Sequence, residues 1–176
     1  MIVERLDRST VTPFVWNHLL EHVRVDGEQG TEANRHAHAA AQEAEDYGQL
    51  ALLTQTIRVT FEAWPDLDCL PLPIIPVLTA GSVTMLANGL AFTAFTVTTG
   101  LRPALALTDV RPTGRVVVQY QAGFGAAESD IPPALAHAIL DQAAAFFDFR
   151  GEGDGKTNGM SAHMARILAR YRRVAL

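Results

Sequence analysis

A run of thirty-three consecutive residues without a charged side chain, from Cys69 to Leu101, constrains this fold more than any other feature. Prolines and glycines interrupt the run and threonines occur throughout, so it cannot form a membrane-spanning helix. Its Ile, Val, Phe and Thr content favours short β-strands. Strands without charges on their faces or edges aggregate unless they are covered. The run is expected either to close into a sheet within the chain or to be buried against another protein, and we favour the second.

Charge is distributed unevenly along the 176 residues, whose formal net charge is -5. Residues 1–68 are strongly acidic overall, whereas residues 155–176 contain basic side chains and no acidic ones. A protein that coats nucleic acid needs a continuous basic surface, so the acidic total argues against that class. An acidic front and a basic tail instead suggest complementary surfaces in an assembly. The charged N-terminus does not resemble a signal peptide, which predicts a cytoplasmic protein.

Apolar residues at helical spacing predict four helices, two on each side of the uncharged run. They are expected at residues 12–24, at 31–47, from about 131, and from about 161. Thr12 before a proline predicts the capped start of the first helix, and Asp130 is expected to cap the third. A stripe of alanines in the second helix permits close packing against a neighbour. The glycine-rich segment from Gly151 to Gly159 is expected to be a mobile loop.

Alternating apolar and polar residues predict strands in the middle of the chain. The alternation is clearest around Ile57 and Val59 and from Arg115 to Ala122, and shorter strands are expected at 82–87, 91–99 and 103–108. This order predicts an α+β fold, a helical bundle with an inserted small antiparallel β unit. The whole chain, 1–176, is expected to be one domain, with residues 1–50 and 130–176 in the helical part and 54–123 in the β unit.

The sharpest enzymatic motif is the string His18-Leu19-Leu20-Glu21-His22. It matches the H-x-x-E-H pattern of inverted zinc peptidases, in which two histidines on one helix face hold zinc. A solvated polar helix face explains the same residues more simply. The alternative function that the string leaves open is a small zinc-dependent hydrolase built on His18, Glu21 and His22.

Other reactive side chains form no persuasive catalytic group. His137 and His163 each stand alone in the sequence, as do His36 and His38 on their helix. Cys69 has no basic neighbour in sequence that would activate its thiol, so a buried and inert cysteine is expected. A third reading of the chain is a small-molecule binding domain that uses the β unit.

Several stretches, found in the right order, resemble the head-tail connector (adaptor) proteins of long-tailed phages and gene transfer agents. They are residues 20–27 (LEHVRVDG), 41–47 (AQEAEDY), 52–58 (LLTQTIR), 116–125 (VVVQYQAGFG), 130–133 (DIPP), 146–150 (FFDFR) and 168–174 (LARYRRV). The resemblance covers nearly the whole chain. It is weakest between Ala80 and Leu107 and in the glycine-rich segment.

The resemblance implies a structural protein without enzymatic activity, cofactor or bound metal. Such a protein forms a ring beneath the portal, commonly of twelve copies, and joins the DNA-filled head to a stopper or tail-completion protein. DNA would pass through the central channel without sequence-specific binding, and no membrane would be involved. The implied location is the neck of a virion or gene transfer agent particle, assembled in the bacterial cytoplasm.

Because the C-terminal segment of this family tends to dock on the portal, the resemblance also implies partner contacts near the end of the chain. The residues expected to make them are Arg166, Arg170, Tyr171, Arg172 and Arg173. Deletion of residues 160–176 is then expected to leave a folded protein that fails to join portal-bearing heads.

Overall fold

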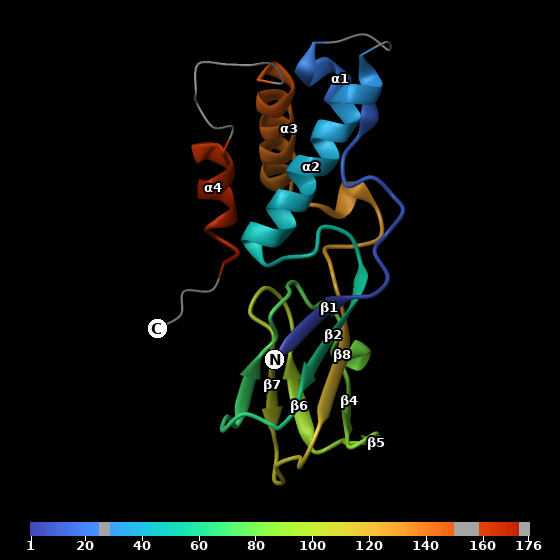
Figure 1. The fold of residues 1–176 in the computed structure, drawn as a ribbon, viewed down its shortest axis with the longest axis vertical. Helices are drawn as coiled ribbons and strands as arrows, with labels where there is room; N and C mark the ends of the chain where they lie inside the picture. Colours follow the sequence, from blue (N-terminus) through green and yellow to red (C-terminus); the bar gives the residue numbers. More distant parts are fainter. Residues whose placement is uncertain (25–28, 150–158, 173–176) are drawn as a thin grey trace. The chain divides into compact units, whose positions relative to one another are not determined.

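The computed structural model describes residues 1–24, 29–149 and 159–172, which form two compact units. The first unit contains Met1–Ser9 and Leu53–Ala126, and the second contains Thr10–Leu52 and Ala127–Leu176. The fold is α+β, as the sequence predicted (Figure 1). Most of the segment 151–159 and the last predicted contact residue, Arg173, lie outside the described residues.

The described residues of the helical unit form four α-helices and one short 3-10 helix. Their bounds are α1 Trp16–Val23, α2 Gly30–Gly48, η2 Glu128–Asp130, α3 Pro133–Asp148 and α4 Ala162–Leu168. The alanine stripe of α2 is buried as predicted, and α2 packs against α3. Small side chains let two helices approach closely, which is why a helix so poor in large apolar residues can belong to a core.

The β unit contains two antiparallel sheets and one short 3-10 helix. Their elements are β1 Ile2–Arg5, β2 Gln55–Phe61, β3 Cys69–Pro71, η1 Ala80–Ser82, β4 Thr84–Ala87, β5 Leu90–Ala91, β6 Phe95–Thr98, β7 Ala104–Leu107 and β8 Val116–Ala122. One sheet has the order β1-β2-β8-β4-β5 and the other β3-β7-β6. In the central pair, Ile57 lies opposite Tyr120 and Val59 opposite Val118, and all four side chains are buried. This confirms the alternation that predicted these two strands.

Two predicted helix caps are wrong. The Thr12 hydroxyl donates to the Phe14 carbonyl (3.2 Å), and α1 begins only at Trp16, after Val15, without a side-chain cap. The Asp130 carboxylate accepts a hydrogen bond from the Ala127 N–H (3.0 Å) and so closes η2. In both cases a short polar side chain satisfies a nearby backbone group outside the helix, a competition typical of Thr and Asp.

Three further expectations need correction. Residues 2–5, assigned to the helical part, form β1 and pair with β2, because a four-residue strand gives too short a pattern to recognise. The strand expected at 91–99 is two strands, β5 and β6, because the Phe95 N–H bonds back to the Thr93 carbonyl in a turn. Cys69 is exposed on β3 rather than buried. No helix in the described part of the chain is long and apolar enough to cross a membrane.

The buried hydroxyl of Tyr120 accounts for part of the stability of the β unit. It accepts a hydrogen bond from the Ile74 N–H (3.0 Å), and both residues are buried. Replacing Tyr120 with phenylalanine is expected to cost about 1–3 kcal/mol, because the Ile74 N–H loses its acceptor without gaining water. Urea denaturation measures the change, and Tyr47→Phe, at an exposed ring, is the control. Equal stability of the two variants would contradict the prediction.

Candidate functional site

The start of α4 is fixed by a buried glutamine of α3. Gln142 is fully buried, its amide nitrogen donates to the Gly159 carbonyl (3.3 Å) and its amide oxygen accepts from the Ser161 N–H (2.7 Å). The Ser161 hydroxyl then caps α4 by accepting a hydrogen bond from the Met164 N–H (3.1 Å). Sequence reasoning missed Gln142 because one polar residue within a helical pattern carries no signal of burial.

The C-terminal segment combines a buried apolar face with an exposed basic one. Met164, Ile167 and Leu168 of α4 are buried in the helical unit. Among the predicted contact residues, Arg166, Arg170 and Arg172 are exposed and Tyr171 is half-buried. Burial raises the pKa of Tyr171, and the charge of Arg170 acts in the opposite direction. The structure therefore presents Arg166 on α4, and Arg170 and Arg172 just after it, to solvent, while the buried face of α4 anchors this segment.

Arg172 is held over an aromatic ring of α2. Its guanidinium carbon lies 4.5 Å from the centre of the Tyr47 ring, within the range of a cation–π interaction.

Tyr47 also lines an open hollow of ≈ 530 Å³, together with Ala39, Gln42, Glu43, Asp46 and Met160. One carboxylate oxygen of Glu43 is buried without a hydrogen-bond partner in the structure, and burial raises the pKa of this side chain. Basic and acidic groups thus lie near one another in the helical unit.

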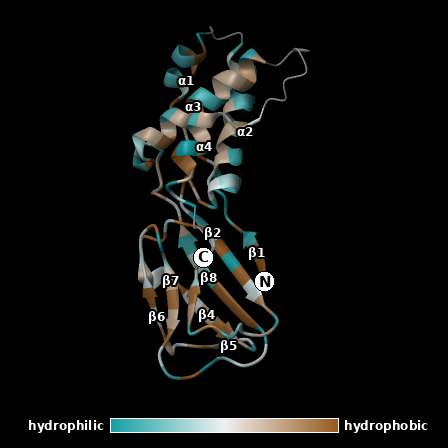
Figure 2. Ribbon diagram, turned by 90° about the vertical axis from the view of Figure 1, so that its left-hand side faces the viewer, coloured by the Kyte–Doolittle hydropathy of each residue, from teal (hydrophilic) through white to brown (hydrophobic). Residues whose placement is uncertain are grey.

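The uncharged run divides into a buried part and an exposed part. Leu70, Leu72, Ile75, Val77 and Met85 contribute to the core of the β unit. Large apolar side chains of the same run remain exposed, namely Leu78, Leu86, Leu90 and Leu101. Figure 2 shows hydrophobic residues along β4, β6 and β7. β6 is an edge strand with neither a charge nor a proline, and such an edge can pair with another chain.

Three charged side chains, Asp66, Asp68 and Arg111, form ion pairs close to the start of the uncharged run. Arg111 pairs with Asp66 and with Asp68, where Nη2 lies 2.7 Å from Oδ1. The hydrogen bond from Arg111 and its charge hold the pKa of Asp66 below the usual range. These side chains are exposed, so the pairs add little stability, but they place charge next to an uncharged surface.

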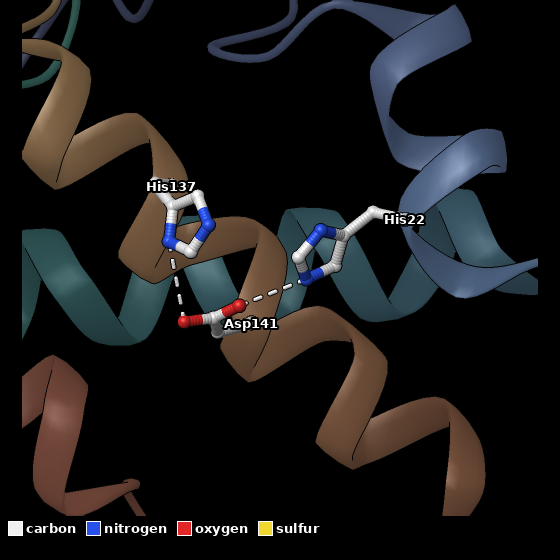
Figure 3. A group of neighbouring side chains, drawn as sticks. All are labelled: His22, His137 and Asp141. Atoms are coloured by element: carbon white, nitrogen blue, oxygen red, sulfur yellow. Dashed lines mark ion pairs between the residues drawn. The ribbon is translucent and has the colours of Figure 1, made fainter.

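Three histidines from three helices converge on one carboxylate in the helical unit. Asp141 of α3 lies 2.8 Å from His22 Nε2 of α1 through Oδ1. Its Oδ2 lies 2.6 Å from His163 Nδ1 of α4 and 3.3 Å from His137 Nδ1, one turn away on α3. Figure 3 shows His22 and His137 directed toward Asp141. One ligand atom from each of His22, His137 and Asp141 lies within 4.8 Å of the others.

This cluster differs from the motif that the sequence suggested. Of the string His18-x-x-Glu21-His22, only His22 belongs to it, and His18 and Glu21 are exposed on α1. His137 and His163, which seemed isolated in the sequence, are brought together by the packing of α4 on α3, with ring centres 5.8 Å apart. The one signal available beforehand was the i, i+4 spacing of His137 and Asp141. The structure therefore does not bring His18, Glu21 and His22 together as the site of the alternative function, a zinc hydrolase.

A hollow in the β unit is small. Its volume is ≈ 100 Å³, and it is lined by Thr54, Leu78, Thr79, Gln121, Ala122 and Gly123. Ligand pockets for small molecules usually enclose about 300–1,000 Å³. The hollow therefore does not favour a small-molecule binding domain.

The sequence matches no model of a known protein family, and no curated protein sequence matches it. Solved structures match over the full length. One chain comes from the virion of a native gene transfer agent particle and aligns with a TM-score of 0.82 at 24% identity, covering 100% of this chain and 97% of that one. The chain shares its fold with a component of these particles.

Two further matches come from necks of gene transfer agent particles. A chain from the neck of an empty particle, computed with C6 symmetry, has a TM-score of 0.79. A chain from the neck of a native particle, computed with C12 symmetry, has a TM-score of 0.75. Each is 25% identical and aligns over 100% of this chain and 97% of its own length. The predicted resemblance to particle proteins is confirmed at the level of these structural neighbours.

Proposed function

We propose that this protein is a head-tail connector, an adaptor that forms a ring beneath the portal and joins the DNA-filled head to a stopper or tail-completion protein. The observation that carries this proposal is the full-length match to chains from gene transfer agent necks. The role is structural and non-enzymatic, and residues 1–176 act as one connector domain.

Ring formation is supported by the surfaces of both units. In a ring, one face of each copy meets a different face of the next copy, so the two faces must complement each other. The exposed leucines and the open edge of β6 provide apolar area and backbone groups to bury. The basic C-terminal segment and the acidic front of the chain provide opposite charges. The neighbouring necks were computed with C6 and C12 symmetry, which supports a ring, and we propose that it has twelve copies.

The portal contact is proposed for the C-terminal segment. Its contact residues are Arg166, Arg170, Tyr171, Arg172 and Arg173. Arg166 lies on α4, which is already packed in the helical unit, so this helix loses little conformational entropy on docking. The acidic total charge suits a channel through which DNA passes without sticking. The protein would act in the particle neck, after assembly in the bacterial cytoplasm.

Electron microscopy of the protein mixed with portal rings tests the proposal. Portal rings from the same particle are incubated with the purified full-length chain, separated from free protein by size exclusion and imaged in negative stain. A second ring of density on one end of the portal is expected. A chain that elutes apart from the portal, leaving its image unchanged, would contradict the proposed function.

A further inference from the structure

The geometry points to a metal site that nothing in the proposed connector role requires: His22, His137 and Asp141 bind a divalent transition-metal ion of the zinc class. His163 is its positioning residue, because it holds the second oxygen of the Asp141 carboxylate. The ion links α1 to α3 and, through His163, steadies α4. Its role is therefore to hold together the helical unit that carries the C-terminal arginines.

The spacing of the side chains fits such an ion. A tetrahedral zinc ion with bonds of about 2.0–2.1 Å places neighbouring ligand atoms roughly 3.3 Å apart. One ligand atom from each of His22, His137 and Asp141 lies within 4.8 Å of the other two. His22 Nε2 lies 2.8 Å from Asp141 Oδ1, and His137 Nδ1 lies 3.3 Å from the other oxygen, Oδ2. Rotation of these side chains would bring one carboxylate oxygen and both imidazole nitrogens around a single ion.

The donor set selects the class of metal. Two imidazole nitrogens and one carboxylate suit zinc and its neighbours in the first transition row. Calcium and magnesium prefer sites made entirely of oxygen, which two histidines out of three ligands do not provide. Three protein ligands leave one position for water.

The supporting contacts resemble the outer shell of a metal site. Ligating carboxylates are usually hydrogen-bonded by a further residue that fixes their orientation. His163 Nδ1 lies 2.6 Å from Asp141 Oδ2, while Asp141 Oδ1 lies beside His22. Asp141 Oδ2 is thus held by His163 of α4 and also lies near His137, whereas Oδ1 lies beside His22 and is the oxygen that would bind the ion.

The three ligand side chains are partly exposed, so an ion can reach them from solvent. The side chains of His22 and Asp141 are 28% and 30% exposed, and that of His137 is 60% exposed. Because His137 is largely in solvent, it can be replaced without opening the core. His18 is exposed on the same helix as His22 but lies outside the cluster, so it is the matched control.

Zinc titration of the full-length chain tests the site. The purification tag is removed, the protein is dialysed against EDTA and then against metal-free buffer, and Zn²⁺ binding is measured by calorimetry and elemental analysis. One ion per chain is expected, together with a rise in the melting temperature of roughly 5 °C at a free zinc concentration 100 times the dissociation constant. Co²⁺ in place of zinc is expected to give the visible absorption of a four-coordinate site.

Variants separate this cluster from other histidines. His137→Ala and Asp141→Asn are each expected to weaken zinc binding at least tenfold, with circular dichroism unchanged, and His18→Ala is expected to bind as the parent does. His163→Ala is expected to keep one ion per chain with affinity lowered about tenfold, as outer-shell changes do. Stoichiometry well below one ion, or parent-like binding by both His137→Ala and Asp141→Asn, would overturn the proposal. Loss of zinc binding by His18→Ala would also overturn the proposal, because it would assign the metal to the string His18-x-x-Glu21-His22 of α1.

Discussion

Replacing Arg166 and Arg170 with glutamate is expected to abolish attachment of the protein to portal rings while the helical unit stays folded. Both side chains are exposed on or just after α4, so the substitutions leave the buried face of that helix untouched. The proposed contact of these arginines with acidic groups of the portal becomes a repulsion, and like charges placed together cost several kcal/mol. Affinity for the portal is therefore expected to fall at least about 100-fold.

A matched variant distinguishes a local contact from a general effect of charge. Arg35→Glu combined with Arg115→Glu makes the same change in net charge at exposed positions on α2 and just before β8. Co-elution with portal rings and ring density in negative stain are measured for both double variants. The proposal predicts normal binding by the control. Equal binding by the two variants would show that the C-terminal arginines do not contact the portal.

The deletion suggested by the sequence is a poorer experiment than these substitutions. Removing residues 160–176 takes away Met164 and Leu168, which are completely buried. It also frees Gln142, a buried side chain that loses its hydrogen bond to the Ser161 N–H. Both changes destabilise the helical unit, because they open a cavity and leave a polar group without its partner. Loss of binding by this truncated chain would follow from unfolding as readily as from a lost contact.

The parts of the fold predicted from the sequence are those with a long, regular pattern. The alanine stripe of α2 and the alternation in β2 and β8 extend over at least two turns of helix or several residues of strand, so local sequence and burial agree. Short elements gave no such pattern. β5 has two residues and is joined to β4 by Asn88 and Gly89, both with positive φ. That Asn-Gly pair is a recognised hairpin signal and could have located the turn.

The histidine cluster shows what a sequence pattern cannot provide. His22, His137 and His163 come from three helices, and only their packing brings the rings to a common carboxylate. The adjacent string around His18 gave a stronger local signal, yet His18 lies outside the cluster. The resemblance to connector proteins succeeded for a different reason, because it drew on the order of many weak stretches along the whole chain.

Replacing Gly123 with alanine is expected to be the most damaging single-methyl change in the β unit. Gly123 has a φ of +143°, and an added Cβ would lie 2.5 Å from the Thr54 nitrogen and 2.6 Å from the Leu53 carbonyl carbon. Both atoms belong to the backbone leading into β2, so no side chain can move aside. We expect a loss of about 3–5 kcal/mol, combining backbone strain with overpacking.

Two other glycines separate these contributions. Gly100 also has a positive φ, +97°, but open space around it, so Gly100→Ala is expected to cost about 1 kcal/mol. Gly81→Ala meets neither obstacle and is expected to be nearly neutral. In a Trp16→Phe background, Trp64 is the remaining tryptophan and reports urea unfolding of the β unit. If Gly123→Ala unfolds at the same midpoint as Gly100→Ala, the close approach of the backbone is not what requires glycine at this position.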